Sequence, residues 1–330
     1  MTQLELTIAC GDYDRTLPLI TGDVVPEGVE LSWSSPPIEQ TITRMLREEA
    51  FDIAEMSLSA TAIAVDRGYP ALVAIPVFPS RFFRHSSVFV NSRSGITSFQ
   101  QLAGKRVGMY NYHRIAAGIW FKGLLSSEYG VQPDQIDWYV ADSAPHGEQD
   151  RIRVDPPPTV RISSIGSDET LDNMLEEGRI DAMLAVRLPE PFRKGSPNVR
   201  RLLEKPMEAE VDYFRRTGIF PIMHTLVIRR EVFEENAWIG VSLCEAFERA
   251  RLRAERVSDD IGEARHSLAW WLLYRERERE LLGDAWIYGV GPNHHTLAVF
   301  LRYCFEQGLT NQLMSPEDLF ADCLWSPNHT

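Results

Sequence analysis

Two arginines and a histidine stand within five residues of one another in this chain, in a segment that reads RFFRH. They are Arg81, Arg84 and His85. A guanidinium group carries paired N–H donors that match the two oxygens of a carboxylate, and an imidazole can donate or accept a proton near neutral pH. The segment is therefore a candidate for binding a carboxylate and transferring a proton. The simpler alternative is that the arginines form structural ion pairs and the histidine fills the core.

The backbone conformation of this segment decides which of its side chains act together. In an extended segment, Arg81 and His85 would share one side with Phe83, while Phe82 and Arg84 would share the other. Only one side could then meet a ligand, and we favour the side of Arg81 and His85. A turn or bulge would allow both arginines to take part.

Four further residues have types suited to the same chemistry. His224 is a second candidate for proton transfer, and Arg15 is a third candidate for binding a carboxylate. Asp14 and Glu55 could orient a histidine or accept the proton of a phenol. Each has a structural alternative, because His224 could be a satisfied core residue, Asp14 a helix cap and Glu55 the partner of an arginine.

Two segments are candidates for binding an anion at the start of a helix. Ser57 and Ser59 precede a helical stretch, so either could be its N-cap, and the first amides of such a helix can bind an anion. Tyr112, His113 and Arg114 precede a second helical pattern and are predicted to contact an anion in the same way. The alternative for this second segment is an exposed loop.

The elements that position these residues follow an α/β pattern. A strand-like stretch at residues 4–10 is followed by a helical stretch at 38–49 and a strand-like run at 51–56. This order is typical of a parallel α/β unit. Similar alternation continues over residues 96–184, and the residues after 238 have the periodicity of helices.

The composition favours two lobes and disfavours two classes of partner. The chain has 330 residues, and this length is more than one domain usually needs. Because 44% of the residues are hydrophobic, the chain can bury a substantial core. Its formal net charge is -13, the wrong sign for nucleic acid or for an anionic membrane surface. We therefore expect neither a nucleic-acid nor a membrane partner.

The N-terminal residues and the cysteines indicate the cellular compartment. Residues 1–10 alternate like a strand and lack the basic start and apolar run of a secretion signal, and no run approaches about 18 apolar residues. Cys10, Cys244, Cys304 and Cys323 are scattered and form no CxxC pair. We expect reduced thiols, mostly buried, in a cytoplasmic protein.

Several common catalytic and metal-binding patterns are missing. The chain has no GxSxG, no HExxH, no P-loop and no GxGxxG placed after a strand. His294 and His295 are adjacent, which is the wrong spacing for a joint metal site on a helix. A divalent metal held by His85, His224, Glu55 and Asp14 stays open.

Two short segments resemble second-lobe elements of type 2 periplasmic binding proteins. They are residues 102–108, LAGKRVG, and residues 178–182, GRIDA. The resemblance implies a two-lobed α/β fold whose chain crosses twice, with the ligand cleft between the lobes. Lobe 1 would comprise residues 1–91 and 223–330, with a helical C-terminal part, and lobe 2 would be the inserted residues 92–222.

Four longer segments resemble the 4,5-dihydroxyphthalate decarboxylase family, whose cytoplasmic enzymes use this fold. They are residues 13–19, 51–59, 75–86 and 217–224, and the similarity covers nearly the whole chain. Two other segments, 112–120 and 142–148, depart from the family pattern. Both lie in the predicted inserted lobe, so the ring substituents that this chain recognises can differ from the family's.

The resemblance implies a decarboxylase of 4,5-dihydroxyphthalate, or of a close hydroxylated aromatic acid, that needs no organic cofactor. Arg15, Arg81 and Arg84 would bind carboxylate, and His85 and His224 would handle protons. The alternative is a solute-binding protein that delivers an aromatic or other organic anion to an ABC-type transporter. A third hypothesis is an enzyme of the menaquinone-pathway type on the same fold. The helical C-terminal third leaves a homo-oligomer open.

Overall fold

The computed structural model describes residues 3–69, 71–113, 115–141, 154–260, 262 and 267–321. The chain divides into two compact units. The first unit comprises Met1–Arg81, His224–Ala298 and Met314–Thr330, and the second comprises Phe82–Met223 and Val299–Leu313. The sequence places the first crossing near residue 91, whereas the structure has it between Arg81 and Phe82. The reason is that residues 88–91 form a strand of the second unit's sheet.

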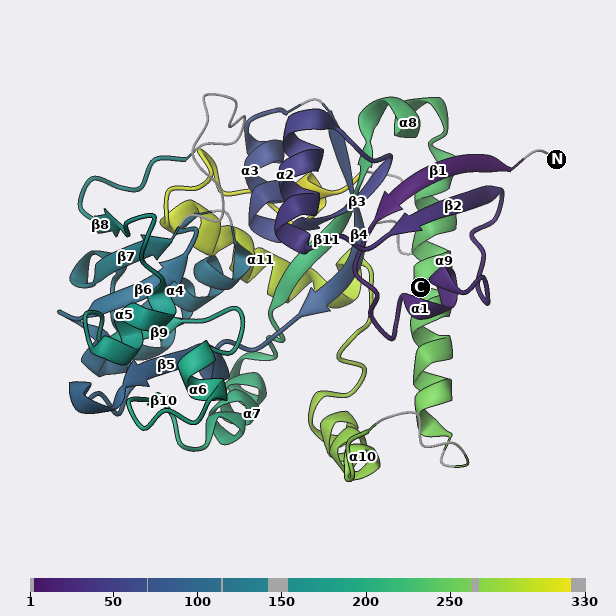
Figure 1. The fold of residues 1–330 in the computed structure, drawn as a ribbon. Coiled ribbons are helices and arrows are strands. Elements are labelled where there is room, and N and C mark those ends of the chain that lie inside the picture. Colours follow the sequence, from purple (N-terminus) through teal and green to yellow (C-terminus); the bar gives the residue numbers. More distant parts are fainter. Residues whose placement is uncertain are drawn as a thin grey trace. The chain divides into compact units, whose positions relative to one another are not determined.

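The first unit contains a mixed five-stranded sheet in the order β2-β1-β3-β11-β4 (Figure 1). β1 runs parallel to both β2 and β3, and β11 runs antiparallel to β3. The described strands are β1 (Leu4–Ala9), β2 (Val29–Ser34), β3 (Ile53–Ser57), β4 (Leu72–Arg81) and β11 (Ile222–Arg229). Every residue of β3 is buried, so this strand forms the centre of the first unit's core.

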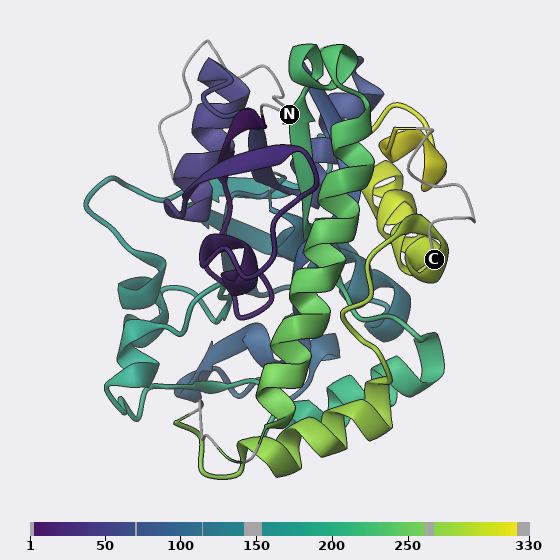
Figure 2. The ribbon, with the colours of Figure 1, turned by 90° about the vertical axis from the view of Figure 1, so that its right-hand side faces the viewer.

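Helices surround this sheet, and α2, α3 and α9 lie near the helical stretches that the sequence predicts, whereas α1 and α8 are not predicted. α2 buries Thr41 and Met45, which are one turn apart, while nearly all of α3 is buried. The short α1 packs on the long α9 (Figure 2). The described helices are α1 (Leu17–Ile20), α2 (Ile38–Glu48), α3 (Leu58–Asp66), α8 (Arg230–Glu235), α9 (Trp238–Asp259), α10 (Trp271–Leu282) and the first part of α11 (Val290–Glu306).

β4 is longer than the sequence indicates. The prolines at Pro76 and Pro79 suggest a break, yet β4 continues through both of them to Arg81. Proline lacks an N–H group, and it is tolerated where a strand lies at the edge of its sheet. β4 is such an edge strand.

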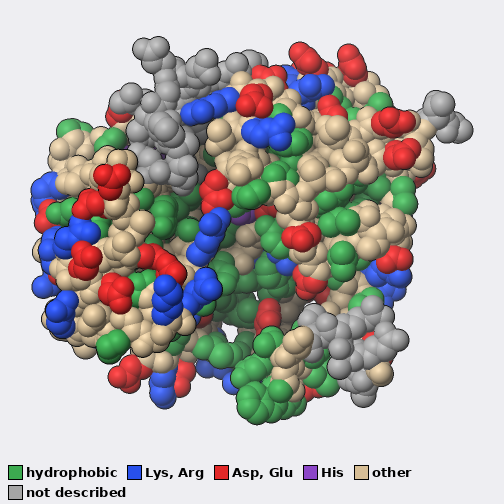
Figure 3. Space-filling model, viewed as in Figure 1, with side chains coloured by type: hydrophobic (Ala, Val, Ile, Leu, Met, Phe, Trp, Pro, Cys, Tyr) green, Lys and Arg blue, Asp and Glu red, His purple; other side chains and the backbone are tan. Residues whose placement is uncertain are grey.

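Helix α10 has no buried residue. Large apolar side chains in and just before it are exposed, and Figure 3 shows apolar side chains at the lower edge of the view, where Figure 1 places α10. They are Leu268, Trp270, Leu273 and Tyr274. After α10 the chain rises beside α9 toward α11 (Figure 2).

The second unit contains a mixed six-stranded sheet in the order β10-β5-β9-β6-β7-β8. Its strands are β5 (Val88–Asn91), β6 (Arg106–Tyr110), β7 (Asp137–Ala141), β8 (Arg161–Ser164), β9 (Ala182–Leu184) and β10 (Val199–Arg201). Its helices are α4 (Ala116–Tyr129), α5 (Leu171–Glu177), α6 (Glu190–Arg193) and α7 (Pro206–Thr217), with the 3-10 turn η1 at His85–Ser87. Phe99, Phe121 and Trp138 are among the fully buried side chains of its core.

The second half of α11 belongs with the second unit, although the sequence assigns the whole C-terminal region to the first lobe. Phe300 packs on Trp120 of α4 with ring centroids 5.3 Å apart, and Gln307 donates a hydrogen bond to the carbonyl of Ile119 over 3.0 Å. These buried contacts attach this half of the helix to α4.

Within the described ranges, no helix is both long enough and apolar enough to span a membrane. Cys10, Cys244 and Cys304 are free thiols, and Cys10 and Cys304 are buried, as the spacing predicts. Cys323 and residues 142–148 lie outside the described ranges.

Candidate active site

Strands β3 and β11 bring Glu55 and His224 together. In their antiparallel pairing His224 lies opposite Ser57 and Leu226 lies opposite Glu55, so Glu55 and His224 are diagonal neighbours on one side of the sheet. Nδ1 of His224 lies 2.6 Å from Oε1 of Glu55. The Glu55 side chain is 1% exposed, and that of His224 is 19% exposed. A buried carboxylate is thus paired with an imidazole that solvent can reach.

The end of β1 supplies further hydrogen bonds to Glu55. Because β1 pairs with β3 up to Ala9 and Ala54, the residues that follow Ala9 lie beside Glu55. The amide of Gly11 donates to Oε2 over 2.9 Å, and the hydroxyl of Tyr13 donates to Oε1 over 2.8 Å. The carboxylate therefore has partners on both oxygens, as a buried charge requires.

These contacts keep Glu55 ionised. Burial raises the pKa of Glu55, but the hydrogen bond and charge of His224 and the donors from Gly11 and Tyr13 outweigh burial and lower the pKa to about 2. Burial and the neighbouring Glu55 carboxylate raise the pKa of Tyr13, so its hydroxyl stays protonated and acts as a donor. At neutral pH the cluster holds one stable negative charge against the His224 ring.

A charged carboxylate on Nδ1 determines what the imidazole can do. It favours the tautomer with hydrogen on Nδ1, which leaves Nε2 as the nitrogen that can exchange a proton with a ligand. This arrangement suits general acid–base catalysis.

Ser57 is the N-cap of α3, which begins at Leu58, but its side chain does not cap the helix. Its hydroxyl instead lies 2.9 Å from the hydroxyl of Ser59, and both side chains are buried. Because Ser57 pairs with His224 across the sheet, the start of α3 lies next to the His224 strand. The predicted role of these serines in substrate binding stays a prediction.

Arg15 is held between two aromatic rings. Its guanidinium carbon lies 4.2 Å from the ring centroid of Tyr13 and 4.1 Å from that of Trp286. Nε and Nη2 donate to the carbonyl of Pro79, and Nη1 donates to Asp14 over 3.0 Å. Two of the five N–H groups of the guanidinium are left for a ligand. Asp14 is 61% exposed and neither caps α1 nor contacts a histidine.

Arg15 and Trp286 also line a cavity of about 610 Å³ in the first unit. This volume is in the range of small-molecule sites. Tyr274 and Trp271 add further aromatic surface, and Glu278 and Arg275 add charged groups of both signs.

Arg81 is buried and its donors are turned inward. Nη2 donates to the carbonyl of Ile287 over 2.8 Å and to Oδ1 of Asn293 over 2.6 Å. Burial lowers the pKa of Arg81 to about 10, so the group stays charged at neutral pH. These contacts favour a structural role in joining β4 to the chain before α11, and a role in substrate binding stays a prediction.

Arg84 and His85 belong to the second unit. β4 ends at Arg81 and His85 starts a 3-10 turn, so the extended segment in which Arg81 and His85 share a side does not occur. Arg84 is buried, and Nη2 lies 2.6 Å from the sulfur of Met223. Burial lowers its pKa to about 10, and no described residue accepts a hydrogen bond from its Nε.

His85 is packed among aromatic rings. Its ring centroid lies 5.2 Å from that of Tyr213 and 5.9 Å from that of Phe99, and 2% of the residue is exposed. Burial lowers the pKa of His85 to about 4, so the ring is neutral at neutral pH. These surroundings are typical of a core side chain, whereas His224 has the environment of a proton-transfer group.

Tyr112 and His113 are buried before α4 in the second unit. Lys122 donates to the carbonyl of Tyr112 over 2.8 Å, and its nitrogen lies 3.5 Å from the Tyr112 ring centroid. Neither ring nitrogen of His113 has a hydrogen-bond partner among the described residues, and burial lowers its pKa to about 3. A buried imidazole without partners is a reasonable candidate for ligand contact. Arg114 lies outside the described ranges.

The predicted metal set does not assemble in the described part of the chain. No group of three or more His, Cys, Asp or Glu side chains there is placed to hold a metal ion. Glu55 and His224 meet as a pair, Asp14 contacts Arg15, and His85 lies in the other unit.

Tyr13 and Trp286 contribute to this site, although the sequence pattern predicts no role for either. Tyr13 lies in a segment that carries the family resemblance, two residues before Arg15. That position is the sequence feature that could have indicated a role in the site. Trp286 is 271 residues from Arg15, and no local pattern links the two.

The fold and the buried carboxylate–imidazole pair define a two-lobed α/β protein of the periplasmic-binding-protein-like class with a site suited to acid–base chemistry. SsuA, a periplasmic sulfonate-binding protein from Methylobacillus flagellatus KT, superposes with a TM-score of 0.57 at 15% identity, covering 97% of this chain and 92% of that chain. The aliphatic sulphonate binding protein SsuA from Escherichia coli gives 0.55 at 14% identity, with the same coverage. At these identities the likeness concerns the fold alone.

A family model described as the periplasmic substrate-binding protein of a phosphonate ABC transporter matches residues 28–150. The 4,5-dihydroxyphthalate decarboxylase of Comamonas testosteroni is 35% identical over 97% of each chain. The enzyme of that name from Pseudomonas putida is 34% identical over 65% of this chain and 83% of its own length. The chain belongs to the 4,5-dihydroxyphthalate decarboxylase family, which confirms the predicted resemblance and fold class.

Proposed function

We propose that this chain is a carbon–carbon lyase that removes one carboxyl group from 4,5-dihydroxyphthalate, giving protocatechuate, or acts likewise on a close hydroxylated aromatic acid. The observation that carries the proposal is the Glu55–His224 pair, with Nδ1 and Oε1 2.6 Å apart, in a chain 35% identical to a relative of that name. A solute-binding protein has no need of an ionised carboxylate that directs an imidazole.

The reaction replaces a carbon–carbon bond by a carbon–hydrogen bond. A ring carbon accepts a proton, its bond to the carboxylate breaks, carbon dioxide leaves, and the freed electron pair restores the aromatic ring. In 4,5-dihydroxyphthalate each carboxylate lies para to a hydroxyl, which supplies electron density to the carbon that is protonated.

His224 is the group that we assign to proton delivery. Its Nε2 would carry the proton to the ring carbon, and Glu55 would hold the ring in place through Nδ1 during the transfer. Tyr13 and Gly11 keep Glu55 ionised and in place. Because His224 is partly exposed, the ring can be protonated again from solvent after each turnover.

Arg15 is the group in the first unit that we assign to the carboxylate that stays on the ring. Its two remaining N–H groups suit a carboxylate, and the two aromatic rings limit its movement. The substrate-binding roles of Arg81, Arg84, Ser57, Ser59, Tyr112 and His113 stay predictions, as does the catalytic role of His85.

The direct test is to incubate the purified protein with 4,5-dihydroxyphthalate and measure protocatechuate by chromatography and carbon dioxide by trapping. The series should include related hydroxybenzoates, each with and without added divalent metal. We expect turnover that the substitution His224→Asn abolishes. Tight binding of an unchanged ligand, without turnover of any compound, would support the solute-binding alternative instead.

We also propose that the protein is cytoplasmic. In support, Cys10, Cys244 and Cys304 are free thiols within the described ranges, which is usual in a reducing compartment. Fractionation of cells that express the natural gene tests this proposal, and recovery in the periplasmic fraction would overturn it.

A further inference from the structure

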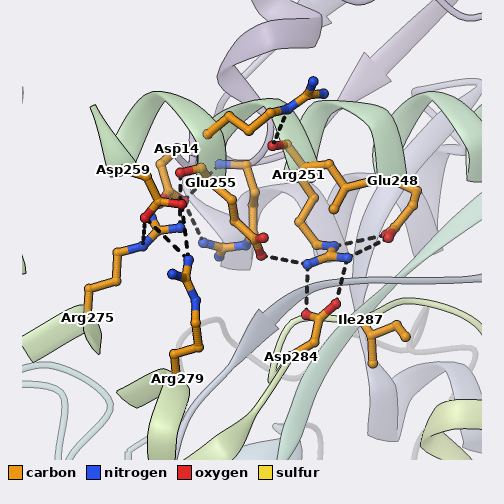
Figure 4. Close-up of polar contacts among 12 residues, drawn as sticks. Asp14, Glu248, Arg251, Glu255, Asp259, Arg275, Arg279, Asp284 and Ile287 are labelled. Atoms are coloured by element: carbon orange, nitrogen blue, oxygen red, sulfur yellow. Dashed lines mark hydrogen bonds and ion pairs between the residues drawn. The ribbon is translucent and has the colours of Figure 1, made fainter. Parts of the chain in front are cut away.

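The loop between α10 and α11, residues 284–289, contains no helix or strand, yet side chains hold it at several points. Arg251 of α9 donates to both oxygens of Asp284, over 2.8 and 3.0 Å (Figure 4). Farther along, Arg81 and Asn293 donate to the carbonyl of Ile287 over 2.8 and 2.9 Å. The amide of Gly289 donates to the carbonyl of Pro76 over 2.9 Å. These contacts hold the loop in place of the regular backbone hydrogen bonds that a helix or strand would have.

The loop places Trp286 on Arg15. Arg15 in turn stacks on Tyr13, and Tyr13 donates to the same oxygen of Glu55 that contacts His224. Trp286 is itself oriented by a hydrogen bond from its indole to Glu278. A continuous set of side-chain contacts within the first unit therefore runs from Trp286 to His224, and Asp284 lies two residues before Trp286 in the loop.

We propose that Trp286 is a positioning residue of the active site and that the Arg251–Asp284 pair holds it there. An arginine side chain has many rotamers, and stacking between two rings removes most of that freedom before the substrate arrives. The loop thereby directs the free N–H groups of Arg15 toward the carboxylate of the substrate. This inference rests on the proposed function, because it concerns the same site.

The surroundings of Arg251 provide a matched control. Its guanidinium is 2% exposed and bonds three carboxylates, those of Glu248, Glu255 and Asp284. Nη1 donates to Glu255 over 2.6 Å and to Asp284 over 2.8 Å. Asp284→Asn and Glu255→Gln each remove one negative charge from the same guanidinium, but only Asp284 belongs to the loop. Figure 4 shows these two carboxylates at different sides of Arg251.

The first experiment does not depend on catalysis. The proteins are treated with phenylglyoxal, which modifies accessible arginines, and the rate at Arg15 is measured by mass spectrometry. We expect Asp284→Asn and Trp286→Leu to raise the rate about fivefold, because the loop releases the stacked guanidinium. Glu255→Gln and the conservative Trp286→Phe should stay within about twofold of the parent protein. Arg84, buried in the second unit, reports on global unfolding and should not change.

The second experiment measures KM and kcat for 4,5-dihydroxyphthalate. We expect Asp284→Asn and Trp286→Leu to raise KM about tenfold, with a smaller change in kcat, as for a weakened carboxylate contact. Trp286→Phe, in contrast to Trp286→Leu, should keep KM close to that of the parent protein. Equal rates of Arg15 labelling in Asp284→Asn and Glu255→Gln would overturn the positioning role. So would an active Asp284→Asn enzyme in which Arg15 is labelled faster but KM is unchanged. If the parent protein decarboxylates none of the acids while the labelling differs as expected, the loop still holds Arg15 and the proposed function alone fails.

Discussion

Nδ1 of His224 lies 2.6 Å from Oε1 of Glu55, and the same oxygen accepts a hydrogen bond from Tyr13 over 2.8 Å. The imidazole belongs to β11 and the carboxylate to β3, which are neighbouring strands of the first sheet. Because the pKa of Glu55 is lowered to about 2, this oxygen carries negative charge throughout the neutral range. The relationship makes His224 the central residue for tests of catalysis.

Replacing His224 by asparagine should lower kcat by about 10² to 10⁴-fold, because a general acid–base group is removed. Steady-state kinetics with 4,5-dihydroxyphthalate measures the loss, and KM should change little. His294→Asn is the matched control, since His294 also faces a carboxylate, that of Glu317 at 3.3 Å, but is 52% exposed. A similar loss of kcat in both variants would contradict the assignment.

Tyr13→Phe should move the acidic limb of the pH–rate profile to higher pH. The substitution removes a donor that lowers the pKa of Glu55, so the carboxylate protonates more readily as the pH falls. Stability should decrease by about 1 kcal/mol, the usual value of one hydrogen bond. Tyr303→Phe, which removes a hydroxyl 2.8 Å from that of Ser127 in the second unit, should leave the profile unchanged.

Glu55 should make folding dependent on pH in acid. Its pKa in the folded chain, about 2, is below the ordinary 4.5, so the unfolded chain binds more protons between these values. The contribution, on the order of 3 kcal/mol, is complete above pH 4.5 and is lost as the pH falls toward 2. Denaturant titrations at several pH values should show this loss in the parent protein and a smaller one in Glu55→Gln. Parallel curves for the two proteins would contradict the prediction.

Arg84→Met and Arg81→Met should have opposite effects. The guanidinium of Arg84 is buried without a carboxylate partner among the described residues, so its removal should leave stability unchanged or raise it, while KM rises about tenfold or more. Arg81 donates to Ile287 and Asn293, and its removal should destabilise the protein by about 2 kcal/mol, the usual value of hydrogen bonds from a charged group. Thermal unfolding and KM, measured for both variants, distinguish a binding arginine from a structural one. Loss of stability with unchanged KM in Arg84→Met would assign that residue to the core.

His85→Phe tests whether the second predicted proton-transfer residue is a core side chain. Its pKa of about 4 lies below the ordinary 6.5, so its contribution to stability is present above pH 6.5 and is lost as the pH falls toward 4. The variant should therefore lose less stability than the parent protein over this interval, and its kcat should stay within about threefold. A loss of kcat as large as that of His224→Asn would show that His85 takes part in the reaction.

Local patterns in the sequence predict most of the elements that hold the site. The strands and helices that contain residues 4–10, 38–49 and 51–56 are found nearly where periodicity places them, because side-chain spacing reflects which side of an element is buried. The pattern fails at β4, where two prolines suggest a break, because only the edge position of the strand in the sheet allows them.

The sequence by itself determines the α/β class, the family and the residue types available for binding a carboxylate and moving a proton. The tertiary structure alone decides which of them meet. Glu55 and His224 are 169 residues apart and become neighbours through the pairing of β3 with β11. Arg81 and His85, only four residues apart, are separated by the end of β4 and belong to different units. Contact between side chains depends on how strands pair and where the chain leaves a sheet, and neither is recorded in the spacing of residues along the chain.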